Sequence, residues 1–187
     1  MREKRRCSWC NLKNERYILY HDREWGVPDF REEYLFEMLI LESFQAGLSW
    51  ECILNKREAF REAFEWFDID RVLLFDEAKI EALIENKGII RNRLKIVAAV
   101  KNAGIFKKIQ AEFGSFYSYL RTFYDGETIY ETDKTHSDLS DRISSDLQKR
   151  GMKFVGSTII YSYLQAIGII NSHECDCFLH YSNLHSK

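Results

Sequence analysis

Residues 149–160 read KRGMKFVGSTII, and this stretch carries the clearest fold signal in the chain. One helix is predicted to end at Gly151 and another to begin at Ser157, so a tight turn joins them. A helix start presents unpaired N–H groups and a positive dipole end, which suits a phosphate. Gly156 has no Cβ and would let a nucleic-acid backbone approach closely. The stretch is therefore either a phosphate-binding hairpin or an ordinary αα-hairpin with a solvated basic edge.

The totals describe an ordinary globular chain. Its 187 residues suffice for one domain, or for two small lobes that share a core. No apolar run of about 18 residues is present, so we expect no membrane span. The charged N-terminus is not followed by a signal segment, which predicts a cytoplasmic protein whose five Cys are reduced thiols or metal ligands. The net charge of −2 argues against nucleic acid unless basic residues gather on one face.

Apolar spacing predicts an all-α bundle, in which strand patterns are essentially absent. Asp29 is expected to be the N-cap of a helix that Gly47 ends, with Glu32 completing a capping box. Ser49 is expected to cap the next helix. Further helices are expected after Asp68 or Asp70, over 77–86 behind Asp76, over 91–112, over 115–123, from Asp138 to Gly151, and from its cap Ser157 to Gly168. Residues 1–28 lack clear periodicity, and 125–137 predict a polar loop.

Thiols and imidazoles occur near both ends of the chain. Cys7 and His21 lie near one end, and His173 and Cys177 near the other. These ligand types suit a closed tetrahedral zinc site, which would join the two ends. A four-thiolate site is a valid competitor, as are five unrelated thiols. That competing set is Cys7, Cys10, Cys175 and Cys177, and Cys52 is expected to be core packing.

One acid, Glu42, lies in an apolar helix between Leu41 and Phe44, close in sequence to several aromatic residues. Aromatic faces and a buried carboxylate both attract cations. The set could form a pocket for a flat cationic heterocycle. Alternatively, the aromatics fill the core while Glu42 pairs with an Arg or a buried backbone N–H. The aromatic members are Tyr17, Tyr20, Trp25 and Trp50.

Many short segments, in one order, resemble the DNA-3-methyladenine glycosylase I family of the helix-hairpin-helix DNA glycosylase superfamily. They are Cys7-Ser8-Trp9, Tyr20-His21-Asp22, Glu24-Trp25-Gly26-Val27-Pro28, Leu35-Phe36-Glu37-Met38, Leu41-Glu42, Gln45-Ala46-Gly47-Leu48-Ser49-Trp50, Gly88-Ile89-Ile90-Arg91, Lys149-Arg150-Gly151, Lys153-Phe154-Val155-Gly156, then Thr158, Tyr161, Ser162, Gln165-Ala166, Gly168, Asn171 and His173. The chain departs from the superfamily at Asn171, where the usual catalytic residue is an Asp.

The resemblance implies an all-α helix-hairpin-helix glycosylase fold over a single domain, 1–187, with the base pocket between two sub-lobes as a variant. It implies a structural zinc that joins the N- and C-terminal segments. The implied zinc ligands are Cys7, His21, His173 and Cys177. The implied pocket is Tyr17, Tyr20, Trp25 and Trp50 around a catalytic Glu42. The implied DNA-binding residues are Gly47 and Leu48, the latter an apolar wedge, with Lys153, Val155, Gly156, Ser157 and Thr158.

The implied reaction is hydrolysis of the N-glycosidic bond of 3-methyladenine in alkylated double-stranded DNA by base flipping. Because N3 alkylation leaves the base cationic, its departure needs little protonation, which fits the presence of Asn171. With no lysine expected in the pocket, we expect no lyase step and an abasic product. We expect a bacterial cytoplasmic monomer that associates with the nucleoid through DNA. A silent DNA-binding relative and a zinc-stapled interaction module are the competing function classes.

Overall fold

The computed structural model describes residues 4–184, and it is mainly helical. Residues 1–3 and 185–187, the outermost parts of the domain predicted over 1–187, lie outside the described residues. The elements are α1 (Glu15–Arg23), α2 (Glu32–Gln45), α3 (Trp50–Asn55), α4 (Arg57–Ala63), η1 (Glu65–Phe67), α5 (Ile69–Val72), α6 (Glu77–Glu85), α7 (Arg93–Phe113), α8 (Phe116–Leu120), β1 (Ile129–Tyr130), α9 (Asp138–Lys149), α10 (Ser157–Ala166), β2 (Ile170–Asn171) and α11 (Tyr181–Leu184). Among the described helices, none combines the length and apolar character needed to cross a membrane.

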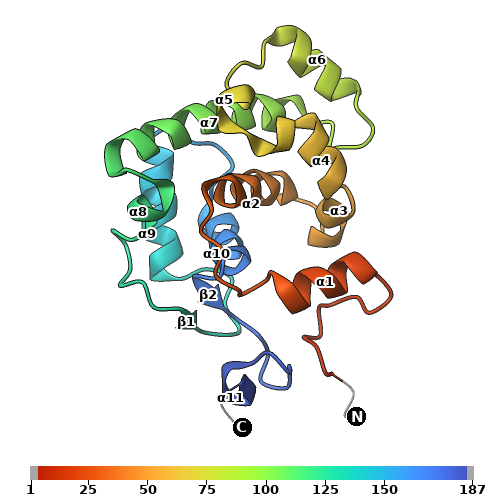
Figure 1. Cartoon of the computed structure of the whole chain (residues 1–187), viewed down its shortest axis with the longest axis vertical. Helices are drawn as coiled ribbons and strands as arrows, with labels where there is room; N and C mark the ends of the chain where they lie inside the picture. The colour runs from red at the N-terminus through yellow and green to blue at the C-terminus, as the bar shows by residue number, and fades with distance from the viewer. Residues whose placement is uncertain (1–3, 185–187) are drawn as a thin grey trace.

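Helix α2 is the centre of the molecule (Figure 1). All its residues from Tyr34 to Phe44 are buried, as expected for a helix that carries apolar residues around its whole circumference. It packs against α3, α7, α8 and α10, and α10 packs in turn along α9. This packing of helices around α2 confirms the prediction of a mainly helical bundle.

Several predicted helix starts are confirmed by side-chain caps. Ser49 accepts from the backbone N–H of Cys52, Asp68 from that of Arg71, and Asp76 from that of Lys79. The helix expected after Ser49 is interrupted at Lys56, where α3 ends and α4 begins. The cap positions follow from local chemistry, because each side-chain oxygen satisfies an N–H that the first turn leaves unpaired.

Two predicted caps are wrong. Helix α2 begins after Arg31, and the Asp29 carboxylate binds the backbone and guanidinium of Arg31 instead. Glu32 closes no capping box, because its carboxylate accepts the first N–H groups of α8, at Phe116 and Tyr117. A local partner thus occupies the Asp29 carboxylate, and a partner distant in sequence occupies that of Glu32.

The second wrong cap is Ser157, which is the first residue of α10 rather than its cap. Gly156 occupies the N-cap position and offers no side-chain hydrogen bond. The Ser157 hydroxyl lies 3.0 Å from that of Ser140 and donates to the Asp141 carboxylate. Helix α9 is capped by Ser137, in a capping box with Ser140.

Two features of the fold were not predicted. Helix α1, capped by Asn14, lies within the segment that showed no periodicity. The polar loop 125–137 contains β1, which pairs in parallel with β2 through Ile129–Ile170 and Tyr130–Asn171. This short pairing attaches the loop to the chain that follows α10, and so carries residues 132–134 toward the site described next.

Candidate functional site

A cavity of about 370 Å³ lies between α1, α2 and α10, and its volume falls within the range of small-molecule sites. The structure brings together there the four predicted aromatics and the predicted acid. The lining residues are Trp9, Tyr17, Tyr20, Trp25, Glu42, Gln45, Trp50, Thr132, Asp133, Lys134, Ser162, Gln165, Ser172 and Glu174. The walls therefore come from both ends of the chain.

Glu42 projects from α2 into this cavity. Its side chain is 3% exposed, and its Oε2 atom is buried without a hydrogen-bond partner. Loss of hydration on burial raises the pKa of Glu42 to about 8. Within residues 4–184, neither an Arg nor a backbone N–H pairs with Glu42. The structure therefore contradicts the alternative in which Glu42 is a core acid with an internal partner.

Aromatic rings surround the acid. The Tyr20 and Trp50 ring centroids are 5.2 Å apart, and the Trp50 Nε1 atom is buried without a partner. Trp9 packs on Tyr17 at 5.4 Å and edge-on against Trp25 at 4.7 Å. Burial raises the pKa of Tyr17 to about 12. Faces of this kind suit a flat ring, and more so one with positive charge.

The sequence interpretation missed several wall residues. Trp9, Gln45, Ser162 and Gln165 all lie in segments that carried the family resemblance, but were assigned no role. Gln165 donates to the Ser172 hydroxyl at 2.8 Å, which gives this wall a fixed polar surface. Each of the four lies in a matching segment close to a predicted site residue, and this proximity could have identified them as site residues.

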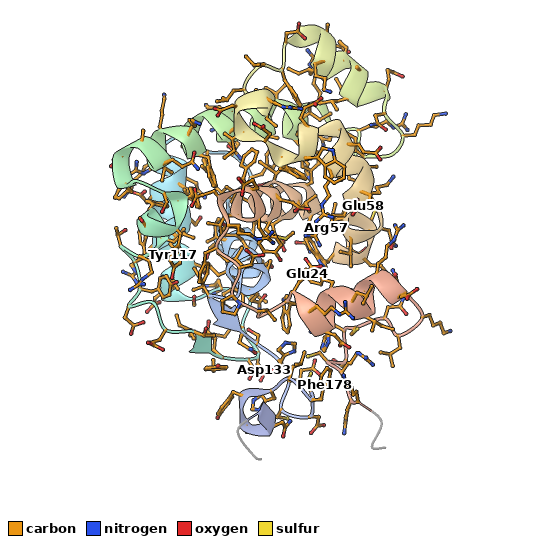
Figure 2. The ribbon with its side chains drawn as sticks, viewed as in Figure 1. Glu24, Arg57, Glu58, Tyr117, Asp133 and Phe178 are labelled. Atoms are coloured by element: carbon orange, nitrogen blue, oxygen red, sulfur yellow. The ribbon has the colours of Figure 1, made fainter. Side chains whose placement is uncertain are left out.

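The rim of the cavity is formed by residues 132–134, and no sequence pattern indicated this role. Asp133 lies beside the chain that follows β2 (Figure 2) and has a left-handed backbone, with φ of 60°. Lys134 also lines the cavity, so the expectation of no lysine there is wrong. Its Nζ atom is 2.5 Å from a Glu131 carboxylate oxygen, and it is half exposed.

The buried arginine lies on the other side of α2, away from Glu42. Arg57 is 6% exposed and donates to Glu37 and to Glu24, each at 2.7 Å. Figure 2 shows Arg57 and Glu24 facing each other between α1 and α4. Arg61 donates to the same Glu37 carboxylate at 2.7 Å. This ion cluster satisfies Glu37 internally.

Cys7, His21, His173 and Cys177 form a buried cluster that could hold a metal ion. Their ligand atoms all lie within 4.8 Å of one another. The remaining imidazole nitrogens have partners, because His21 Nδ1 lies 2.8 Å from Asp22 and His173 Nε2 lies 3.2 Å from the Trp25 carbonyl. Such outer contacts orient the rings so that the other nitrogens face the thiols.

The other cysteines lie apart from this cluster. Cys175 is exposed and contacts Asp176, and the Cys10 thiol contacts the Tyr17 carbonyl at 3.9 Å. Cys52, expected in the core, is only half-buried. The geometry therefore assembles the two-thiol, two-imidazole set rather than the four-thiol competitor.

The predicted DNA-contacting residues form two exposed elements. Gly47 has φ of +83° at the end of α2, and Leu48 beyond it is 40% exposed. In the hairpin, Lys153 and Thr158 are exposed, while the Val155 side chain is buried and could meet a ligand only through its backbone. A Cβ at Gly156 would meet no described atom within 4 Å, so the start of α10 is open to approach.

Asn171 does not line the cavity. Its Oδ1 accepts from the His173 N–H at 3.2 Å, and its Nδ2 lies 3.5 Å from the Gly26 carbonyl. A Cβ on Gly26, which has φ of +73°, would come within 3.2 Å of this amide. Asn171 therefore braces the chain between β2 and the Cys/His cluster.

Comparisons with known proteins agree with this geometry. Residues 9–180 match the methyladenine glycosylase family model. The chain is 40% identical over 178 residues to DNA-3-methyladenine glycosylase 1 of Escherichia coli (strain K12), covering 92% of this chain and 95% of the relative. It superposes on a crystal structure of 3-methyladenine DNA glycosylase I with a TM-score of 0.89, at 41% identity, over 94% of this chain and 100% of that one. A variant of 3-methyladenine DNA glycosylase I in complex with 3-methyladenine gives 0.87 at 34% identity, over 92% and 95%.

Proposed function

This chain belongs to the methyladenine glycosylase family, and we propose that it hydrolyses the N-glycosidic bond of 3-methyladenine in alkylated double-stranded DNA after the nucleotide has turned out of the duplex. The product is an abasic site. The whole described chain acts as one glycosylase domain, with the cavity between α1, α2 and α10. The single observation that carries the proposal is the unpartnered Glu42 carboxyl at an aromatic-walled cavity.

Glu42 explains selectivity for a charged base. Its pKa of about 8 means that the empty cavity holds mostly the protonated acid near neutral pH. A base alkylated at N3 carries a full positive charge, which favours the carboxylate and offsets its lost hydration. Neutral adenine offers no such compensation, so an ionised Glu42 beside it would remain a costly buried charge. The carboxylate would accept hydrogen bonds from the adenine edge while Tyr20, Trp25 and Trp50 stack around it.

The same charge explains why the site needs no strong acid for the leaving group. The cationic base leaves the sugar as a neutral molecule, so no proton has to be delivered to it. Asn171 carries a neutral amide, which cannot act as a general base, and its Oδ1 accepts from the backbone N–H of His173. We assign Glu42 to recognition of the methylated base. Activation of the attacking water would require its carboxylate to face the sugar as well.

A lyase step is not part of the proposal, although Lys134 lines the cavity. A lyase needs an uncharged amine that attacks the sugar carbon. Lys134 is ion-paired with Glu131 at the rim and half exposed to solvent, so its Nζ atom is held by a carboxylate rather than presented to the sugar. Trapping with borohydride gives no covalent protein–DNA adduct if this is correct, and an adduct lost in Lys134→Ala would contradict it.

Two exposed elements would engage the duplex. Leu48, 40% exposed beyond the end of α2, is suited to fill the space that the extruded nucleotide leaves. The start of α10 offers backbone N–H groups of Val155, Gly156, Ser157 and Thr158 to a phosphate, with Lys153 adding charge. Ser157 would contribute through its N–H, because its hydroxyl is bound to Asp141.

We propose a structural zinc ion at Cys7, His21, His173 and Cys177. With ligand bonds of about 2.3 Å to sulfur and 2.0–2.1 Å to nitrogen, a tetrahedral zinc separates sulfur and nitrogen by roughly 3.5 Å. The Cys7–His173, Cys177–His21 and Cys177–His173 separations are 3.4, 3.5 and 3.5 Å, so the residues fit. The ion would fix the N-terminal segment against the chain after β2, and would take no part in the chemistry.

Zinc content tests this assignment. We expect one equivalent of zinc per chain by mass spectrometry, lost in Cys177→Ser and retained in the matched control Cys175→Ser. Chelation should lower the melting temperature of the wild type, because metal binding is coupled to folding. A purified, metal-supplemented protein without stoichiometric zinc would remove the ion from the proposal.

The decisive functional assay is release of free base from methylated duplex DNA, followed by chromatography under single-turnover conditions. We expect 3-methyladenine and an abasic strand from the wild type, and little from Glu42→Gln. A protein that binds the duplex in a salt-dependent manner but releases nothing would instead be a silent binder. We further propose a monomer acting in the bacterial cytoplasm on nucleoid DNA, and sedimentation of the protein alone tests the monomer.

A further inference from the structure

Helix α7 carries two buried polar side chains that the proposed reaction does not use. They are Lys95 and Asn102, which are 7% and 1% exposed. Neither lines the cavity, and both are too buried to meet a phosphate. Buried polar groups of this kind are costly unless they are hydrogen-bonded, so their partners indicate what they do.

Asn102 holds the hairpin turn, residues 151–156. Its Nδ2 donates to the Lys153 carbonyl at 2.9 Å, and its Oδ1 accepts from the Lys153 N–H at 2.9 Å. One amide therefore satisfies both backbone groups of a turn residue. The next residue, Phe154, has a left-handed backbone with φ of 56°, a conformation that surrounding contacts must hold in place.

Lys95 holds the other exposed element, the wedge tip, which comprises Gly47 and Leu48. Its Nζ donates to the Phe44 and Ala46 carbonyls at 2.8 and 2.6 Å. These are among the last carbonyls of α2, which have no partner inside the helix, and a cation suits this end of the dipole. Burial lowers the pKa of Lys95, but both carbonyls stabilise its charged form.

The two anchors act from one face of one helix. Lys95 and Asn102 are seven residues apart, which is nearly two helical turns or about 10 Å along α7. The Lys95 ammonium also lies 5.8 Å from the centroid of the Phe154 ring, so it contacts the hairpin turn as well as the end of α2. A single rigid element thus connects the two parts of the molecule that face the duplex.

We propose that Lys95 and Asn102 are positioning residues for base extrusion, which fix the wedge tip relative to the hairpin turn. A phosphate held at the hairpin turn then places Leu48 at a set distance along the duplex, against the base step to be opened. This inference rests on the proposed function, since it assumes that the wedge tip and the hairpin turn both engage DNA.

The test uses Lys95→Met, which keeps the buried stem and removes the ammonium, and Asn102→Ala. Lys108→Met, an exposed change on the same helix, is the matched control. The fluorescence of 2-aminopurine beside the lesion measures unstacking. Single-turnover release of 3-methyladenine measures the chemical step, and binding of free 3-methyladenine measures the integrity of the cavity. Each variant is also titrated with an uncleavable duplex to measure its affinity for DNA.

We expect Lys95→Met to slow unstacking and release by about tenfold at saturating protein, with free-base affinity within about twofold of wild type. Asn102→Ala should weaken binding to the uncleavable duplex by about tenfold. Lys95→Arg, which retains donors for both carbonyls, should recover much of the unstacking rate. A purely structural role would lower the melting temperature and leave these rates unchanged at low temperature.

If folded Lys95→Met unstacks the duplex and releases the base at wild-type rates, the inference is overturned. It is also overturned if Asn102→Ala binds DNA with unchanged affinity. If Lys95→Met does not fold, Asn102→Ala alone carries the test. Failure of the proposed function looks different. In that case the wild type releases no base, or Leu48→Ala unstacks and releases as the wild type does.

Discussion

Two glutamates of α2 show how differently one helix can use the same side chain. Glu37 and Glu42 are 7% and 3% exposed, and each lies in an apolar run. Glu37 accepts from Arg57 and Arg61 at 2.7 Å, whereas the Glu42 Oε2 atom has no partner. The two arginines satisfy the buried Glu37 carboxylate within the protein, whereas the unpaired Glu42 carboxyl is free to bind a ligand.

Their different roles follow from their spacing. Five residues along a helix correspond to a rotation of about 140°, so the two carboxyls leave α2 on different sides. One side faces α4, which supplies both arginines, and the other faces the cavity. The pair therefore provides an internal control, because substitution of each acid by Gln makes the same chemical replacement on the same helix, once in an ion cluster and once at the cavity.

The largest expected effect is on stability, at Glu37. Glu37→Gln leaves the 6% exposed Arg57 with only Glu24 as an ionic partner, and breaking a buried pair of this kind costs about 3 kcal/mol of unfolding free energy. Urea denaturation measures the loss. Release of 3-methyladenine per folded molecule should remain within about twofold, and a midpoint equal to wild type would show that the Glu37 cluster does not stabilise the fold.

The opposite outcome is expected at Glu42. Glu42→Gln should slow base release by roughly 100-fold, equivalent to about 2.7 kcal/mol, because Glu42 is the one buried acid among the cavity-lining residues that the structure describes. Its unfolding free energy should equal or exceed that of the wild type, since a neutral amide replaces an acid whose ionisation is costly there. Wild-type release by this variant would remove Glu42 from recognition.

The pH dependence of the reaction should reveal the role of Glu42. The cationic base requires ionised Glu42, so kcat/KM should rise about tenfold per pH unit up to about pH 8 and then level off. In Glu42→Gln this rise should be absent. Stability should change in the opposite direction. Because the folded pKa is raised from 4.5 to about 8, the unfolding free energy of the wild type relative to Glu42→Gln should fall as pH rises across that interval.

The smallest expected effect concerns an aromatic wall of the cavity. Trp50→Phe keeps an apolar face but loses stacking area, which should weaken 3-methyladenine binding by roughly threefold to tenfold. Quenching of the remaining tryptophan fluorescence measures the affinity. Trp66, which is 63% exposed and is not among the residues that line this cavity, gives the matched control Trp66→Phe, for which we expect no change.

Local chemistry made much of the fold predictable. The caps at Ser49 and Asp76 were predicted because each is completed within three residues. Asp29 and Glu32 were misassigned because their carboxylates bind Arg31 and the start of α8, and the latter lies more than eighty residues away. The pairing of β1 with β2 depends equally on a distant partner, and two residues per strand give no readable alternation.

The candidate site shows the same limit. Glu42 and its aromatic neighbours could be chosen from the sequence because an acid in an apolar run is unusual and the family resemblance covers these positions. The sequence does not reveal which of the two acids, Glu42 or Glu37, pairs with an arginine. That pairing depends on how α4, which carries Arg57 and Arg61, packs against α2. Residues 132–134 reach the rim only through the pairing of β1 with β2, and Lys95 had no signal beyond a basic position in a helix.

The cavity has walls from both ends of the chain, with Trp9 on one side and Ser172 and Glu174 on another. Ser8 is hydrogen-bonded to Glu174 through its N–H and hydroxyl at 2.7 and 2.6 Å, which ties these walls together. Because the ribosome synthesises the chain from its amino end, Trp9 is made long before Ser172 and Glu174, which line the same cavity. The cavity is therefore complete only once residue 174 has been synthesised, and we expect chains that end before this residue to lack one wall of the cavity and to release no base.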